Sequence, residues 1–225
     1  MSRPRSSSVV TSLIIGALLL LLGTSPARAD FPKPSPYPIS WELKFTHGLP
    51  KRIVVNVPNS NIPQAYWYMT YTVTNLGDKE QMFLPRFELM TEDGRLTRGD
   101  VNIPRDVFDA IKAKERNKLL EPVTSITGLL RLGEAEARDG VAIFPEPTPR
   151  MGHFSIFVTG LSGEAVTLKN VNGEFQKIDD AEQMKNPKDL IILRKTLQLN
   201  FFIRGDEVYP GEDEVNQDTE VWIMR

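Results

Sequence analysis

Apolar and polar residues alternate with a period of two along much of the chain after residue 38, a pattern typical of half-buried β-strands. The longest example is 65–75, where one face carries threonines together with Tyr66 and Tyr68. The opposite face carries Trp67, Met69, Tyr71 and Val73. Because successive side chains of a strand point to opposite faces of its sheet, we expect this apolar face to lie inside the protein, with Trp67 in the core.

Shorter segments with the same period predict further strands along the chain. They are 39–46, 53–57, 81–91, 125–132, 140–145, 152–160, 190–204 and 220–224, with a hairpin at 166–177 and a short polar helix at about 180–185. Asn172-Gly173 suits a type I′ turn, 92–95 predicts a second hairpin turn, and Pro85 indicates an edge or a bulge. Many short strands separated by turns favour a two-sheet antiparallel sandwich over a parallel α/β fold.

The pattern changes clearly at about 102–117, where apolar residues recur with the period of a helix. Asn102 is expected to cap this helix and Pro104 to occupy its first turn. Val107 and Ile111 belong to its apolar stripe. The predicted fold class is therefore mainly β: an antiparallel β-sandwich with one inserted helix.

The first 29 residues have the three-part layout of a cleavable secretory signal peptide. Arg3 and Arg5 precede an apolar stretch from Val9 to Leu22, and an A-x-A site ends at Ala29. The alternative is an uncleaved membrane anchor, but fourteen helical residues rise only about 21 Å, which is short of the roughly 30 Å hydrocarbon core. We therefore expect cleavage after Ala29 and a secreted or periplasmic protein whose mature chain has no membrane span.

Residues 30–38 follow the cleavage site with a proline at every second position, which predicts an extended lead-in to a domain at 39–225. Loss of Arg3, Arg5 and Arg28 with the signal leaves 24 basic and 29 acidic residues, a net charge of −5. This charge weighs against nucleic acid as a partner. The chain has no cysteine, so its stability does not come from disulfides, and this composition favours a bacterial exported protein.

Three segments carry a resemblance to a known group of proteins. Residues 66–78, YWYMTYTVTNLGD, resemble the strand and turn of exported bacterial immunoglobulin-like domains. Residues 138–144, RDGVAIF, and 154–161, FSIFVTGL, are similar to the paired strands that follow in uncharacterised members of that group. The resemblance implies an immunoglobulin-like sandwich and an exported location, with Trp67 filling the core where antibody domains have a disulfide. It implies no activity.

Motifs for catalysis or metal binding are weak in this sequence. His47 and His153 are the two histidines, and each is expected to be a surface or turn residue rather than a metal ligand. Gly160-Leu161-Ser162-Gly163 lacks the second spacer of a serine nucleophile elbow and indicates a turn. No cofactor and no catalytic residue are predicted.

An acidic segment at 206–220 is the one candidate metal site. Its candidate calcium ligands are Asp206, Glu212, Asp213, Glu214 and Asp218. Their spacing does not fit an EF-hand, and a solvated acidic loop is the favoured interpretation.

Tyr66 and Tyr68 are candidate binding residues, since aromatic side chains on an open strand face can stack on sugars or hold a partner. The favoured alternative is that the inserted helix covers this face through Val107 and Ile111. The sequence thus predicts a non-enzymatic binding or structural module of the cell envelope, with an unidentified protein or glycan as its partner. A carbohydrate-active hydrolase using Asp or Glu and a small-ligand or calcium-binding domain are the alternatives.

Overall fold

The computed structural model describes residues 31–58, 60–171, 173–178, 190–204 and 214–225. The chain divides into two units, and the first, Met1–Phe31, lies outside the described residues except for Phe31. The second unit, Pro32–Arg225, contains the other described residues. No helix among the described residues is long and apolar enough to cross a membrane.

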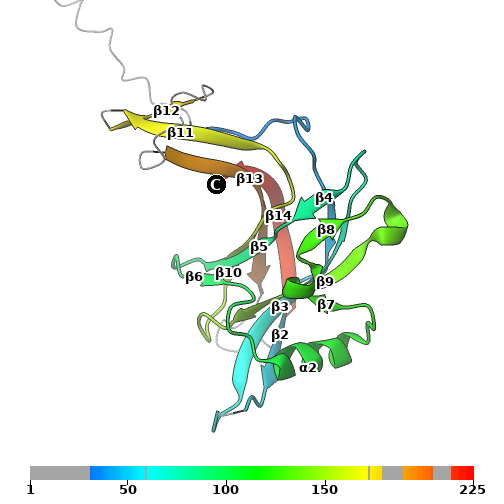
Figure 1. Ribbon diagram of the computed structural model, residues 1–225. Coiled ribbons are helices and arrows are strands. Elements are labelled where there is room, and N and C mark those ends of the chain that lie inside the picture. The colour runs from blue at the N-terminus through cyan, green and yellow to red at the C-terminus, as the bar shows by residue number, and fades with distance from the viewer. Residues whose placement is uncertain (1–30, 59, 172, 179–189, 205–213) are drawn as a thin grey trace, which may run out of the picture. The chain divides into compact units, whose positions relative to one another are not determined.

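Two large sheets and one small sheet make up this unit, which is mainly β as predicted (Figure 1). The first sheet contains β1 (Lys44–His47), β2 (Lys51–Val55), β3 (Gln64–Thr74), β9 (Arg138–Pro145) and β7 (Glu121–Pro122). The second contains β5 (Arg86–Thr91), β6 (Leu96–Arg98), β10 (His153–Thr159), β11 (Ala165–Val171), β12 (Glu174–Lys177), β13 (Leu190–Ile203) and β14 (Val215–Met224). The small sheet pairs β4 (Gln81–Phe83) with β8 (Gly128–Leu130). All the pairings between these strands are antiparallel except that of β7 with β9.

β1 and β2 lie end to end along one edge of β3. His47 pairs with Tyr71 and Lys51 pairs with Tyr68, so the β1–β2 side has one residue more than β3 between these two pairs. This extra residue forms a β-bulge, at which the Gly48 amide donates to the Thr70 carbonyl oxygen at 2.9 Å. The other edge of β3 pairs with β9.

The core between the two large sheets contains the apolar face predicted for β3. Trp67, Met69 and Val73 are completely buried, and the Trp67 ring packs against Phe154 of the second sheet with 5.6 Å between ring centroids. From the second sheet the core receives Phe87, Leu89, Phe154, Ile156, Val158, Leu197, Leu199, Phe201, Ile203 and Val215. Two antiparallel sheets that enclose one apolar core are consistent with a β-sandwich.

A second core lies on the opposite face of the first sheet, under α2 (Arg105–Glu115). Tyr66 and Tyr68 are buried there against Val107 and Ile111. The helix therefore covers the face that the two tyrosines occupy, as the favoured interpretation of the sequence expected.

Several local predictions were wrong. Asn102 does not cap α2: Pro104 takes the N-cap position, and Asn102 has a positive φ of 55°. The strand predicted at 125–132 begins later, because α3 (Val123–Ile126) forms a helical turn before β8, and a 3₁₀ turn (Glu134–Glu136) follows.

Further predicted strands have different bounds from those expected: the strand at 39–46 is Lys44–His47, with Ile39 exposed, and the strand at 53–57 is Lys51–Val55. The segment 81–91 is two strands that belong to different sheets, and Pro85, which has no amide hydrogen to donate, lies between them. The last strand begins at Val215 rather than at 220. The hairpin turns at 92–95 and around Gly173 are confirmed, and the short helix predicted at 180–185 lies outside the described residues.

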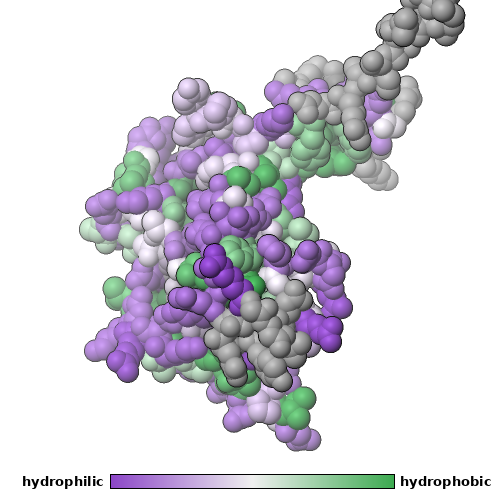
Figure 2. Space-filling model, turned by 180° about the vertical axis from the view of Figure 1, so that it is seen from behind, coloured by the Kyte–Doolittle hydropathy of each residue, from purple (hydrophilic) through white to green (hydrophobic). Residues whose placement is uncertain are grey.

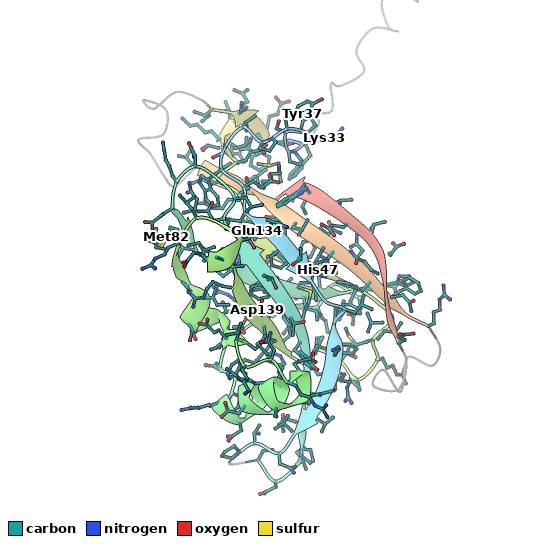
Figure 3. The ribbon with its side chains drawn as sticks, turned by 90° about the vertical axis from the view of Figure 1, so that its right-hand side faces the viewer. Lys33, Tyr37, His47, Met82, Glu134 and Asp139 are labelled. Atoms are coloured by element: carbon teal, nitrogen blue, oxygen red, sulfur yellow. The ribbon has the colours of Figure 1, made fainter. Side chains whose placement is uncertain are left out.

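β11, β12 and the first residues of β13 form an arm with a small core of its own, made of Leu168, Leu193 and Met224. β11 and β10 pair with successive parts of β13. Figure 2 shows apolar side chains gathered on the arm, where Ile192 and Phe175 are about half exposed. The proline-rich lead-in lies beside the arm, as Lys33 and Tyr37 show in Figure 3, and the Ser35 amide donates to Glu164 at 2.7 Å.

Candidate functional site

A cavity of about 440 Å³ lies beside the first turns of α2, between this helix, α3 and the edge of β9. Its apolar wall consists of Ile103, Phe108, Pro122, Val123 and Ile143. Its polar lining consists of Asp100, Arg105, Asp109, Thr124 and Ser125. This volume lies within the range of small-ligand sites, and an apolar wall with a few polar groups is typical of them.

Asp100 is held at this cavity by the backbone of Ile143. The Asp100 amide donates to the Ile143 carbonyl oxygen at 2.8 Å, and the Ile143 amide donates to Asp100 Oδ1 at 3.3 Å. Asp100 Oδ2 is buried, and no described residue supplies it with a hydrogen bond. One oxygen of this carboxyl group is therefore fixed, and the other has no partner from the protein.

Burial raises the pKa of Asp100 to about 7, although the hydrogen bond from Ile143 acts in the opposite direction. A carboxyl group that leaves water favours its neutral form, because the charge loses its hydration. Near neutral pH the group therefore exists in both protonation states. A carboxyl group with a strongly shifted pKa in a cavity is a candidate functional group.

The local backbone accounts for the position of Asp100. The residue has a φ of 60°, in the left-handed region that few residues other than glycine adopt. At Gly99 an added Cβ would lie 2.9 Å from the Phe144 ring. The absence of a side chain at Gly99 thus lets the segment after β6 cross close to β9, where Asp100 meets Ile143.

Two ion pairs surround the cavity. Arg105 Nε lies 3.6 Å from Asp109 Oδ2 on the exposed side of α2. Next to Pro122 and Ser125 of the lining, Arg138 of β9 pairs with Glu121 of β7 at 2.6 Å. Each pair contains one positive and one negative group, so neither adds a net charge.

Tyr71 of β3 lies within electrostatic range of Asp100. Burial raises the pKa of the Tyr71 hydroxyl far above its usual range, and the charges of Asp100 and Glu121 act in the same direction. The hydroxyl therefore stays neutral at any physiological pH. It is buried, and no described residue forms a hydrogen bond with it.

Tyr66 and Tyr68, the candidate binding residues, lie under α2 and are not available to a ligand. Tyr68 donates its hydroxyl hydrogen to Glu115 Oε1 at 2.7 Å, and Lys51 Nζ lies 2.9 Å from the same oxygen. This cluster attaches the C-terminal end of α2 to the sheet. The two tyrosines are therefore structural in this part of the fold.

The candidate calcium ligands are only partly described. Asp206, Glu212 and Asp213, like the predicted cleavage site at Ala29, lie outside the described residues. Glu214 immediately precedes β14, and Asp218 lies within β14 rather than in a loop. Asp218 lines a separate shallow depression with Glu92 and His153. Among the residues that the structure describes, no group of three His, Asp or Glu side chains is placed to hold a metal ion.

The two histidines differ in their surroundings. The His47 side chain is only 8% exposed, lies against Phe45 and Phe201, and has Nε2 3.6 Å from Glu220 Oε2. His47 is the last residue of β1, just before the bulge at Gly48, and its side chain is more buried than a surface position would give. His153 is exposed and stacks on Phe202, as the prediction required.

Sequence reasoning missed Asp100 altogether. The residue belongs to no motif with a mechanism, and its neighbour Ile143 is 43 residues away in the sequence. The one local signal is the glycine before it, which indicates a close approach of the backbone to another element.

Comparisons with protein-family models, with curated proteins and with solved structures found no match for this chain.

Proposed function

We propose that this chain is an exported binding module of the cell envelope and that the cavity beside Asp100 is its ligand site. The observation that carries the proposal is the cavity of about 440 Å³, which has an apolar wall and is lined by Asp100, whose Oδ2 is buried and has no partner among the described residues. A buried polar group without a partner costs stability, and such a cost is commonly retained where the group serves a function.

The order of the strands supports an immunoglobulin-like sandwich as the scaffold. In the constant-type immunoglobulin domain one sheet has strands A, B, E and D, and the other has C, F and G. The order β1/β2, β3, β9, β7 corresponds to A, B, E, D, and the order β5, β10, β13 corresponds to C, F, G. β6, β11, β12 and β14 are additional strands in this comparison, and the parallel pairing of β7 departs from the immunoglobulin pattern.

Export rests on the signal peptide predicted at 1–29. Mass spectrometry of the protein recovered from outside the cytoplasm should find Asp30 as its first residue. A mature protein that retains Met1 to Ala29 would contradict this part of the proposal.

Occupation of the cavity can be tested with a neutral probe. Benzyl alcohol, titrated into the ¹⁵N-labelled mature protein, should shift the amide resonances of Asp100, Ile103 and Ser125. Ser125→Trp places an indole at the cavity and should abolish the shifts. Lys79→Trp, which places the same ring at an exposed position elsewhere, should leave them unchanged. If the shifts occur elsewhere on the protein, or survive Ser125→Trp, the cavity is not the site.

A hydrolase is the second candidate, because one observation favours it. Asp100 and Asp109 line the same cavity, and Asp100 has the raised pKa that a general acid needs. However, Asp109 is half exposed and pairs with Arg105, and Asp100 Oδ1 already accepts the Ile143 amide. We therefore expect no release of nitrophenol from 4-nitrophenyl glycosides by the mature protein. Release that is lost in both Asp100→Asn and Asp109→Asn would favour the hydrolase.

A further inference from the structure

The ligand class of this cavity follows from its charge and its lining, and the inference rests on the proposed function. We infer that the cavity binds a small ligand with a positively charged amino group on an apolar body, and that the negative charge of Asp100 in the cavity lining attracts the amino group. Arg105 and Asp109, the other charged residues of the lining, pair with each other, so Asp100 is the charged lining residue without an ionic partner among the described residues.

The charge of the cavity is set by Asp100. From α2, Arg105 and Asp109 face the cavity as a pair; next to the lining, Glu121 of β7 pairs with Arg138 of β9. The Tyr71 hydroxyl on β3 remains neutral, and α3 contributes only the hydroxyls of Thr124 and Ser125. Because the two pairs cancel, the cavity is neutral when Asp100 is protonated and carries one negative charge when Asp100 is ionised.

An ammonium group satisfies this arrangement better than other head groups do. It offers three hydrogen-bond donors and no acceptor, and the carboxylate oxygen offers only acceptors. The Asp100 carboxyl group is largely buried, so its attraction to a nearby positive charge is less weakened than it would be at the surface. The alternative is a carboxylate ligand that accepts a hydrogen bond from protonated Asp100, and ionised Asp100 would repel such a ligand.

The body of the ligand is expected to be apolar and small. Phe108 and Ile103 come from one side of the cavity, and Val123 and Ile143 come from the other. A ring or a short branched chain buried between them would leave water, which stabilises the complex in proportion to the apolar area.

The proposal predicts a pH-dependent affinity for the ligand, which a purely structural role for Asp100 would not produce. A cation binds the ionised form, so its affinity must rise as Asp100 loses its proton. With a pKa of about 7, the group is about 3% ionised at pH 5.5 and about 97% ionised at pH 8.5. The affinity for a cation should therefore rise about 30-fold between these two pH values.

The experiment compares three probes of nearly equal shape on the mature protein at pH 5.5, 7.0 and 8.5. The probes are benzylammonium, benzyl alcohol and benzoate, and their dissociation constants are measured from the amide shifts of the cavity residues. Benzylammonium should bind most tightly at pH 8.5 and lose affinity about 30-fold at pH 5.5. Asp100→Asn should remove the pH dependence and the preference for the cation. Asp218→Asn, which removes one acid from the other depression, should change neither.

Each other outcome has a definite meaning. If benzyl alcohol and benzylammonium bind the cavity equally at every pH, the cation is not recognised, and the cavity remains a binding site. If benzoate binds best and weakens as the pH rises, Asp100 acts as a hydrogen-bond donor and the inference is overturned. If none of the probes shifts the cavity residues, the proposed function fails together with the inference. The wild-type pH profile decides between these outcomes even if Asp100→Asn does not fold.

Discussion

Near each end of α2 a carboxyl group lies against the first sheet: Glu115 is the last residue of the helix, and Asp100 belongs to the segment before it. The two groups have opposite surroundings. At the C-terminal end, Glu115 accepts hydrogen bonds from Tyr68 and Lys51. Burial alone would raise the pKa of Glu115, but these bonds and the nearby Lys114 hold it below its usual range. At the N-terminal end, Asp100 has only a backbone amide, and burial raises its pKa to about 7.

This difference separates a structural carboxyl group from a candidate functional one. Both groups lose water on folding, which alone would raise the pKa of either. Glu115 recovers that loss through two donors of its own chain. A negative charge at a helix C-terminus is unfavourable with the helix dipole, and Lys51 offsets this effect. Asp100 recovers little, because the Ile143 amide is the one donor to its carboxyl group among the described residues. The substitutions below test whether the comparison holds.

The largest effect is expected from Trp67→Ala, which weakens the sheet on which both ends of α2 rest. The indole is completely buried between the two large sheets, so its removal should lower the free energy of unfolding by about 3 to 5 kcal/mol. Urea unfolding measures this loss. Trp67→Phe should cost less, because it keeps a ring and removes a buried N–H that has no partner among the described residues. Near wild-type stability of Trp67→Ala would mean that the faces of β3 are assigned wrongly.

The next largest effect on the free energy of unfolding is expected from Asp100→Asn, which should stabilise the protein. Because the pKa of Asp100 is about 7 in the folded protein and about 4 in the unfolded chain, the folded protein holds the extra proton between these values. Wild-type stability should therefore fall as the pH rises from about 4 to about 7, by up to roughly 4 kcal/mol. Asp100→Asn should be more stable than the wild type at pH 8 and should lack most of this fall. Unfolding curves at pH 4.5 and pH 8 measure the stability of both proteins. If stability changes equally with pH in both, the burial of this group is contradicted.

A smaller effect of opposite sign is expected from Glu115→Gln. The lowered pKa of Glu115 means that its ionised form stabilises the fold above the unfolded pKa, and that this contribution is lost as the pH falls through the folded pKa. At pH 7 the substitution should cost about 1 kcal/mol, since Lys51 is half exposed and its pairing is screened. At pH 3 the cost should shrink. The thermal midpoints of both proteins at the two pH values measure this, and a cost that does not depend on pH would show that charge is not the cause.

The smallest effect, no change, is expected from calcium. Asp100 and Glu115 are single carboxyl groups, and the described residues contain no cluster for a metal. An ion that does not bind the folded protein cannot stabilise it, so millimolar Ca²⁺ should leave the melting temperature unchanged. A rise that Na⁺ at equal ionic strength does not reproduce, and that Asp213→Asn removes, would establish a calcium site in the acidic segment.

The strands and turns could be predicted wherever local rules decide them. The two faces of β3 follow from strict alternation, and the hairpins at 92–95 and around Gly173 follow from turn residues next to them in the sequence. Pro85 marked an irregularity. It could not show that the chain changes sheets there, since the partners of β4 and β5 lie far away in the sequence.

The sequence by itself determined that this chain is mainly β and that Trp67 faces the core, because side-chain periodicity depends only on neighbouring residues. It favoured α2 as the cover of Tyr66 and Tyr68, which the folded chain confirmed. Tertiary structure alone decided where the candidate site lies and which groups surround its carboxyl groups. Glu115 meets Lys51 across 64 residues, and Asp100 meets Ile143 across 43. The pKa of a carboxyl group depends on the donors and the water around it, and both are set by segments that only the folded chain brings together.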